Sequence, residues 1–269
     1  MTRRLASILL AVTLWTGVSY AEEGGTNAEY LWTKETTVET FFEAQMGFGL
    51  LDDPGFTGGR GTPITDFFGA AYAFLPNFGM SIGLPLAGSL SSGADDYGIG
   101  NIVLGGKVVI PMERLRFALG MDIALPTAQS SAAIGIFTRP YSYFVDDQFA
   151  ISPYAAVSFT RDRLTLSVDA GTDFQIYSTA PAGAGDFEDV IFYDAAVAMA
   201  VYENIWTTVE FGGYSRVTYD NFRNQFFAGP GIRYQDHELS LGSHIAAPFR
   251  SPDKDTIDFQ VIFDFRLLF

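Results

Sequence analysis

Residues 255–269 read Asp-Thr-Ile-Asp-Phe-Gln-Val-Ile-Phe-Asp-Phe-Arg-Leu-Leu-Phe, with an apolar side chain at every second position. The apolar series consists of Ile257, Phe259, Val261, Phe263, Phe265, Leu267 and Phe269. The interleaved series is mostly polar and consists of Asp258, Gln260, Ile262, Asp264, Arg266 and Leu268. A period of two indicates a β-strand with two different faces. Such a strand fits either a soluble sandwich or a membrane barrel that turns its apolar face toward lipid.

The composition favours a β protein and excludes several classes of function. The 269 residues include 28 Gly and 25 Phe, and 48% of all residues are hydrophobic. Cysteine is absent, which excludes disulfides, thiolate metal sites and a cysteine nucleophile. The formal net charge of -15 makes the chain a poor partner for nucleic acid.

Residues 1–21 have the pattern of a secretory signal peptide. Arg3 and Arg4 precede an apolar run over residues 5–14, and Ser19 and Ala21 are the small residues that a signal peptidase requires. We therefore expect cleavage before Glu22, with an uncleaved anchor as the alternative. The polar residues 22–36 are expected to form a periplasmic N-terminal segment, although they could also enter the lumen of a barrel. Residues 37–269 would form the barrel itself.

Alternation of apolar and polar residues recurs along the rest of the chain and predicts about twelve strands of membrane-crossing length. The expected strands cover residues 37–50, 64–75, 78–86, 99–110, 115–125, 148–160, 163–176, 189–202, 205–215, 223–234, 238–247 and 255–269. No stretch after the signal is long and apolar enough for a membrane-spanning helix.

The connections between these strands alternate in length. Short turns are expected near Pro76, Met112, Arg161, Glu203 and Asp236. Longer loops are expected near Gly58, Ser91, Ser131, Gly183, Tyr219 and Ser251. An even strand count with short turns on one side and long loops on the other is typical of a bacterial outer-membrane barrel. The fold prediction is therefore an all-β, closed antiparallel transmembrane barrel in which residues 255–269 pair with the first strand.

One segment resembles a known family. Residues 95–107, Asp-Asp-Tyr-Gly-Ile-Gly-Asn-Ile-Val-Leu-Gly-Gly-Lys, are similar to a recurring segment of outer-membrane proteins assigned as transporters of the MetA pathway of phenol degradation. Members of that family share a Gly-x-Gly-Asp/Asn-hydrophobic segment before a glycine-containing strand, a signal peptide and an aromatic C-terminal strand. The resemblance implies a transporter-like barrel for aromatic or other hydrophobic compounds, and it brings no catalytic residues.

The polar series of the expected strands supplies a candidate lumen lining. These residues are Glu39, Phe41, Glu43, Lys107, Arg116, Asp122, Tyr154, Asp169, Asp173, Trp206, Glu210, Arg233, His244, Asp258, Asp264 and Arg266. The excess of acids predicts a preference for cations if the pore is open. The inward aromatic residues suit an aromatic or amphipathic solute, or they simply pack the lumen.

A catalytic role would require particular polar residues to lie together. A serine hydrolase needs a histidine beside its serine, and the chain has only His237 and His244. Ser243 and His244 are adjacent in an expected strand, so they face opposite sides. The carboxylate pairs Asp169/Asp173 and Glu39/Glu43 are better explained as parts of a hydrated, acidic lumen than as catalytic pairs.

No cofactor or metal is expected. The loop acids Asp95, Asp96, Asp253 and Asp255 lack the spacing of an EF-hand. The short motif around Gly98 and Gly100 lacks the later glycine and the helix of a dinucleotide site.

The sequence thus predicts a passive outer-membrane channel or transporter for small solutes, including hydrophobic or aromatic ones, and not an enzyme. The expected partners are outer-membrane lipid, the solute and the barrel-assembly machinery, which recognises a terminal aromatic strand resembling residues 255–269. The alternatives are a non-transporting structural or surface-interaction barrel with a plugged lumen and, third, a lipid-modifying enzyme.

Overall fold

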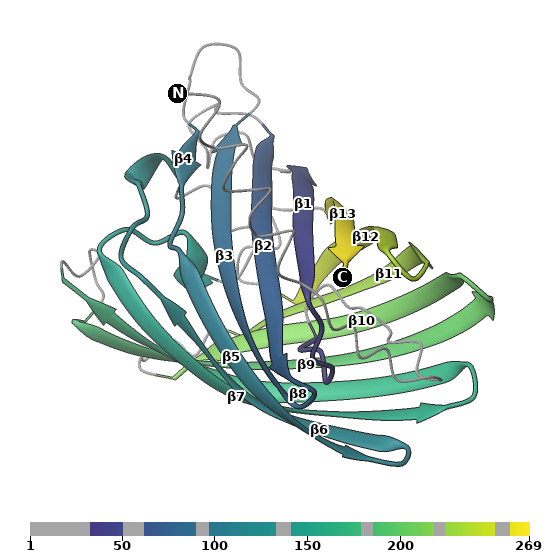
Figure 1. Cartoon of the computed structure of the whole chain (residues 1–269). Coiled ribbons are helices and arrows are strands. Elements are labelled where there is room, and N and C mark those ends of the chain that lie inside the picture. The colour runs from purple at the N-terminus through teal and green to yellow at the C-terminus, as the bar shows by residue number, and fades with distance from the viewer. Residues whose placement is uncertain are drawn as a thin grey trace, which may run out of the picture.

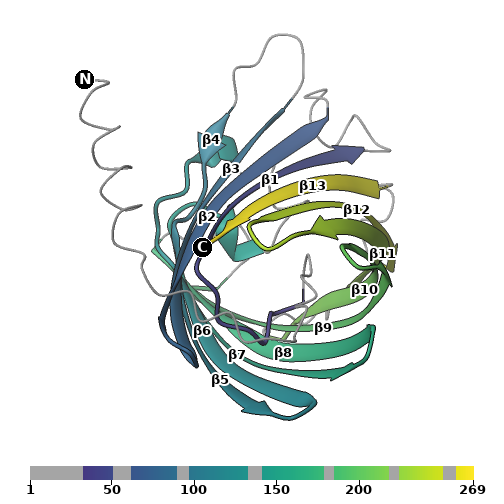
Figure 2. The ribbon, with the colours of Figure 1, turned by 45° about the vertical axis from the view of Figure 1, so that its right-hand side comes forward.

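Twelve long antiparallel strands close into a barrel (Figures 1 and 2). The computed structural model describes residues 33–50, 62–89, 97–132, 141–178, 185–217, 224–250 and 259–269. The strands are β1 (Phe41–Leu50), β2 (Pro63–Leu75), β3 (Phe78–Ser89), β5 (Val103–Met112), β6 (Leu115–Ala124), β7 (Gln148–Arg161), β8 (Leu164–Tyr177), β9 (Phe187–Tyr202), β10 (Ile205–Arg216), β11 (Asn224–Gln235), β12 (Leu239–Arg250) and β13 (Phe259–Leu268). The two-residue strand β4 (Gly98–Ile99) pairs with β3, and a 3-10 turn η2 covers Tyr141–Tyr143.

The last strand closes the barrel against the first, as the sequence predicts. In the register between β1 and β13, Phe41 lies opposite Leu268 and Leu50 opposite Phe259. The pairing of β2 with β3 completes the ring. Closure leaves no open sheet edge, and an open edge in lipid would leave backbone groups without hydrogen bonds. In the described ranges, no helix is long and apolar enough to cross a membrane.

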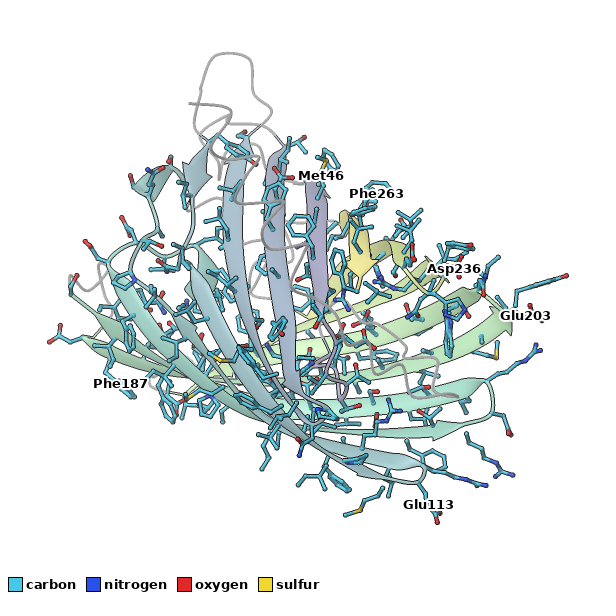
Figure 3. All side chains as sticks on the ribbon, viewed as in Figure 1. Met46, Glu113, Phe187, Glu203, Asp236 and Phe263 are labelled. Carbon is cyan, nitrogen blue, oxygen red and sulfur yellow. The ribbon has the colours of Figure 1, made fainter. Side chains whose placement is uncertain are left out.

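Successive residues of each strand face opposite sides of the wall, and the outer side is apolar. In β13, Phe263 is 51% exposed, whereas its neighbours Ile262 and Asp264 are buried. Figure 3 shows Met46, Phe187 and Phe263 pointing away from the barrel. Further exposed apolar side chains belong to Met80, Ile82, Leu104, Leu119, Met121, Val168, Met199, Phe211, Ile232 and Ile245. This outer layer is the surface that a bilayer covers.

Replacing Phe263 with arginine is expected to destabilise the barrel by about 2–4 kcal/mol, because the charge would face the hydrocarbon layer from the middle of β13. Urea-induced unfolding in lipid vesicles measures the change. As a control, arginine in place of the exposed turn residue Glu203 should cost much less. Equal unfolding midpoints for the two variants would show that Phe263 does not face lipid.

The short connections lie together along one rim. Glu113, Glu203 and Asp236 mark three of these turns in Figure 3. Asp162 has a φ of 54° in the turn between β7 and β8, a left-handed conformation that aspartate tolerates better than most residues. We refer to this end as the short-turn rim. In bacterial outer-membrane barrels the short turns are periplasmic.

Most strands lie within three residues of their predicted bounds, and two described regions differ in a more informative way. The first strand begins at Phe41 rather than at residue 37. The expected strand over residues 99–110 is divided into β4 and β5, because Asn101 leaves the sheet to hold a loop. The side-chain amide of Asn101 donates to the carbonyls of Ser142 and Val145, and its oxygen accepts from the backbone N–H groups of Thr127 and Ala128. Residues 95–107, which carry the family resemblance, therefore hold the connection between β6 and β7 through the hydrogen bonds of Asn101.

Contacts determine which side chains of β2 face inward, which the sequence alone does not reveal because the adjacent Phe67 and Phe68 are both apolar. The ring of Phe67 stacks on Tyr143 of η2, with centroids 6.2 Å apart, whereas Phe68 is exposed on the outer surface. Phe67 therefore faces inward and packs against the loop that Asn101 holds.

Candidate functional site

The candidate site is the interior of the barrel, and it is lined by charged side chains from strands far apart in the sequence. The structure places eight of the predicted lining residues among the buried ones: Asp169, Asp173, Trp206, Glu210, Arg233, His244, Asp264 and Arg266. Another seven are half-buried: Glu39, Phe41, Glu43, Lys107, Arg116, Asp122 and Tyr154. Asp258 lies outside the described residues.

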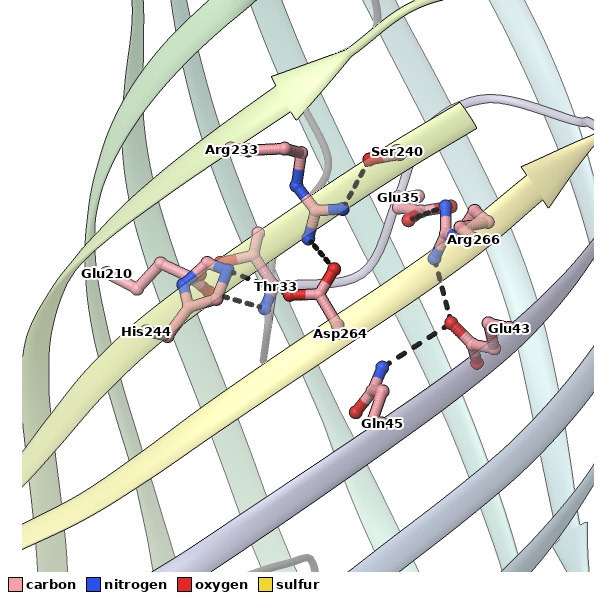
Figure 4. Close-up of polar contacts among 10 residues, drawn as sticks. All are labelled: Thr33, Glu35, Glu43, Gln45, Glu210, Arg233, Ser240, His244, Asp264 and Arg266. Atoms are coloured by element: carbon pink, nitrogen blue, oxygen red, sulfur yellow. Dashed lines mark hydrogen bonds and ion pairs between the residues drawn. The ribbon is translucent and has the colours of Figure 1, made fainter. Parts of the chain in front are cut away.

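Arg233 and Asp264 form the centre of the first ionic network (Figure 4). An Nη atom of Arg233 lies 2.7 Å from Oδ1 of Asp264, and both side chains are almost fully buried. The other Nη donates to Ser240 at 2.7 Å. His244 lies between two acids, with Nδ1 3.5 Å from Glu210 and Nε2 3.5 Å from Asp264. This network joins β10, β11, β12 and β13 from the inside.

Arg266 forms the second network by bridging two glutamates. Its two Nη atoms lie 2.7 Å from Glu35 and 3.0 Å from Glu43. Its guanidinium also lies over the ring of Phe41, 4.0 Å from the centroid. Planar guanidinium groups suit this combination of carboxylate pairing and ring stacking. The pairs hold β13 to β1 and to the residues that precede β1.

Those preceding residues, 33–39, lie inside the barrel, and we call them the strap. Figure 2 shows this segment crossing the interior before β1 begins. The backbone N–H of Lys34 donates to Asp169 at 2.7 Å, and that of Thr33 donates to Glu210 at 3.4 Å. The Thr36 hydroxyl contacts Ser158. The described end of the expected periplasmic segment therefore follows the alternative course into the lumen, while residues 22–32 lie outside the described part.

The Lys34 ammonium occupies a cage on the inner wall. It lies 2.7 Å from Oδ2 of Asp122, 4.9 Å from the centroid of the Tyr154 ring and 6.0 Å from that of Phe192. Cations are attracted to the faces of aromatic rings at such distances. Gly120 and Gly171 make room for these rings, because a Cβ atom on Gly120 would collide with Tyr154 and one on Gly171 with Phe192.

The charges of the strap are set by their surroundings. Burial disfavours the Lys34 ammonium, but attraction to Asp122 outweighs this effect and raises the pKa of Lys34 well above its ordinary value. Burial likewise disfavours the Glu35 carboxylate, but Arg266 and Lys107 outweigh it and lower the pKa of Glu35. Both strap residues are therefore charged at neutral pH.

A third polar group lies in the half of the barrel nearer the long loops. Asp173 accepts hydrogen bonds from Ser152 and Gln175, each at 2.7 Å. The Tyr177 hydroxyl contacts Gln175 at 2.7 Å and Glu188 at 3.1 Å, and Arg216 lies 3.2 Å from Glu188. Polar side chains thus continue along the interior beyond the strap.

Sequence reasoning missed several residues of this interior: Lys34, Glu35, Gln175, Glu188, Phe192 and Asp194. Asp194 lies directly opposite Asp169 in the register of β8 and β9. Gln175 and Glu188 are buried. Gln175 continues the polar series of residues 163–176, although it is absent from the predicted lining. Glu188 falls before the predicted strand over residues 189–202, because β9 begins at Phe187. Residues 33–36 of the strap have no such alternating period, and their place depends on charges contributed by distant strands.

Within the described part of the chain, the side-chain contacts of His244 are with carboxylates, whereas a serine hydrolase needs its histidine beside a serine. Ser243 lies among the outward-facing Ile232, Tyr234 and Leu241, on the other side of the wall from His244. Both ring nitrogens of His244 lie near carboxylates instead. His237 is exposed in a turn. Among the described residues, no three histidine or acidic side chains are grouped as metal ligands. The loop acids Asp95, Asp96, Asp253 and Asp255 fall outside these residues.

A closed barrel with an apolar outer surface and an ionic interior defines the class: this is a bacterial outer-membrane β-barrel. Residues 17–245 match the family described as "Putative MetA-pathway of phenol degradation", and the chain belongs to that family. The family that residues 95–107 resemble is therefore confirmed. No functionally described protein sequence matches the chain in a direct sequence comparison.

Solved structures of outer-membrane porins and channels share the fold. An outer membrane channel from Pseudomonas putida F1 has a TM-score of 0.63 at 9% identity, covering 93% of this chain and 100% of that one. The NanC porin has a TM-score of 0.60 at 10% identity, with 85% and 98% covered. The KdgM porin, solved in complex with disordered oligogalacturonate, has a TM-score of 0.54 at 10% identity, with 84% and 99% covered. At these identities the likeness concerns the fold.

Proposed function

We propose that this protein is a passive outer-membrane channel for small solutes. The observation that carries the proposal is the inner face of the closed barrel, where ionisable side chains extend from Arg266 and Glu43 to Glu188 and Arg216. A polar lumen is what a water-filled path through a barrel needs. The porins and channels that share the fold support the same proposal, as does membership of the family whose resemblance implies a transporter-like barrel.

The solutes that suit this interior are small and polar or amphipathic, with cations favoured. The chain carries 31 acidic residues against 16 lysines and arginines. In the described part of the lumen, Asp169, Asp194 and Glu210 lie near the ammonium of Lys34. Of the three aromatic residues that the sequence places in the lumen lining, Tyr154 contacts this ammonium and Phe41 contacts Arg266. Trp206 is 1% exposed and packs on Ala196 and Ala198, which favours a packing role for its ring.

A second candidate function is a non-transporting barrel with a filled lumen, and the strap is the observation that favours it. A liposome-swelling assay separates the two candidates. Liposomes that contain the folded protein are diluted into isotonic solutions of small solutes of increasing size. We expect swelling with the smallest solutes and none with large oligosaccharides. Swelling no faster than that of protein-free liposomes, for every solute, would contradict the channel and favour the filled barrel.

Neutralising the acids around Lys34 is expected to weaken the preference for cations. In the double variant Asp169→Asn/Asp194→Asn, the reversal potential across a KCl gradient should move toward zero, because fixed carboxylates attract cations into the lumen. The matched control is Asp162→Asn/Asp236→Asn, which replaces the same number of carboxyl groups in exposed turns. If both variants shift the potential equally, the lumenal acids do not select the ion.

A further inference from the structure

The cage around the Lys34 ammonium has the composition of a cation-binding site. One carboxylate, from Asp122, accepts the hydrogen bond from the ammonium, and the rings of Tyr154 and Phe192 lie beside it. All three wall residues come from strands, namely β6, β7 and β9, whereas Lys34 comes from the strap. The side chains of Lys34 and Asp122 remain 27% and 18% exposed, so the site is open to the lumen.

Several carboxyl groups besides Asp122 lie near this site, against the one ammonium of Lys34. Asp194 lies opposite Asp169 in the sheet, and the charges of Asp169, Asp194, Glu210 and Lys34 interact. Asp169 is 2% exposed, and its Oδ2 atom has no hydrogen-bond partner within the described structure. A buried carboxylate oxygen without a donor is costly. The wall therefore favours cations beyond the one that the strap supplies.

We propose that Asp122, Tyr154, Phe192 and Asp169 form a lumenal subsite for primary alkylammonium cations, and that Lys34 is its tethered occupant. The lysine side chain is itself a primary alkylammonium, so its contacts show which ligand the wall accepts. A primary ammonium can donate a hydrogen bond to Asp122 and still meet the ring faces, whereas a quaternary ammonium has no N–H to donate. The role of the subsite in selecting solutes rests on the proposed channel function.

The test removes the tethered ammonium and supplies a free one. Lys34→Ala leaves a space that matches n-propylammonium, which has the three carbons and the nitrogen that the substitution removes. The strap should stay in place, because the backbone N–H groups of Thr33 and Lys34 and the Glu35 carboxylate keep their contacts. Isothermal titration calorimetry of the folded protein in detergent measures the binding of n-propylammonium.

We expect Lys34→Ala to bind n-propylammonium about tenfold or more tightly than the wild type, in which Lys34 competes. A tenfold gain corresponds to about 1.4 kcal/mol. Binding should be lost in Lys34→Ala/Asp122→Asn and weakened in Lys34→Ala/Tyr154→Leu, which retains every carboxylate. The neutral 1-propanol, tetramethylammonium and NaCl at equal ionic strength should not reproduce the effect. Heat-modifiable migration in gels verifies folding, and Lys34→Ser is a second variant that vacates the site.

Two results would overturn the subsite: equal binding by the wild type and by both vacated variants, or binding that survives the loss of Asp122. A separate measurement tests the channel, namely the uptake of n-propylammonium by proteoliposomes. Binding of n-propylammonium without its uptake would contradict the channel proposal and support the subsite proposal. Uptake without tighter binding by the vacated variants contradicts the site and keeps the channel.

Discussion

Replacing Arg233 with methionine is expected to reduce the free energy of unfolding by about 3–5 kcal/mol, the usual cost of removing one partner of a buried ion pair. Arg233 and Asp264 have side-chain exposures of only 4% and 6%, so water cannot replace the lost guanidinium. The Ser240 hydroxyl would also lose its donor. Urea titration of the barrel in lipid vesicles, followed by tryptophan fluorescence, measures the loss.

The matched control for Arg233 also removes the charge of Asp264, which Arg233→Met leaves without its ion-pair partner. The double variant Arg233→Met/Asp264→Asn should be more stable than Arg233→Met alone, because the asparagine removes the buried carboxylate that has lost its guanidinium partner. If Arg233→Met unfolds at the same urea concentration as the wild type, the ionic network does not hold β11 to β13.

Loosening the strap is expected to have the largest effect on conduction. Replacing residues 33–36 with Gly-Ser-Gly-Ser removes the side chains that bind Asp122, Arg266 and Ser158 and adds flexible backbone. Single-channel conductance should rise several-fold, because the segment no longer occupies a fixed place in the lumen. Lys34 and Glu35 carry opposite charges, so the net charge of the lumen is unchanged and the rise reports the obstruction itself.

The control for the strap is a change of similar chemistry outside the lumen. Replacing the turn residues Glu113 and Arg114 with Gly-Ser makes the backbone more flexible at the short-turn rim and should leave the conductance unchanged. Equal conductance of the wild type and the strap variant would show that residues 33–36 do not limit the path.

The architecture could be predicted because its signal is local and repeated. The alternation in residues 163–176 and 255–269 reports directly that one face meets lipid and the other does not. The alternation of short turns and long loops then predicts that the barrel closes through the pairing of β13 with β1. The structure confirms both the closure and this pairing. Phe67 and Phe68 show the limit of the method, since two adjacent apolar residues leave the facing open until Tyr143 is placed beside one of them.

The interior could be predicted only in part. The residues Asp169, Glu210, Arg233 and Asp264 follow from the period of their strands. The period of the strands does not reveal which of these residues form ion pairs. Arg233 meets Asp264 only because the closed barrel brings β11 and β13, which are not adjacent, close together. The strap is harder to predict, because residues 33–36 precede the alternating pattern, and the partners of Lys34 and Glu35 lie 88 and 231 residues further along the chain.

The most direct test of the central claim is the single-channel current of the purified wild-type protein in a planar lipid bilayer. The account predicts discrete current steps that carry K⁺ in preference to Cl⁻, with larger steps after the strap is loosened. Folded protein shown by protease protection to be inserted in the bilayer, yet carrying no current with either the native or the loosened strap, would contradict it.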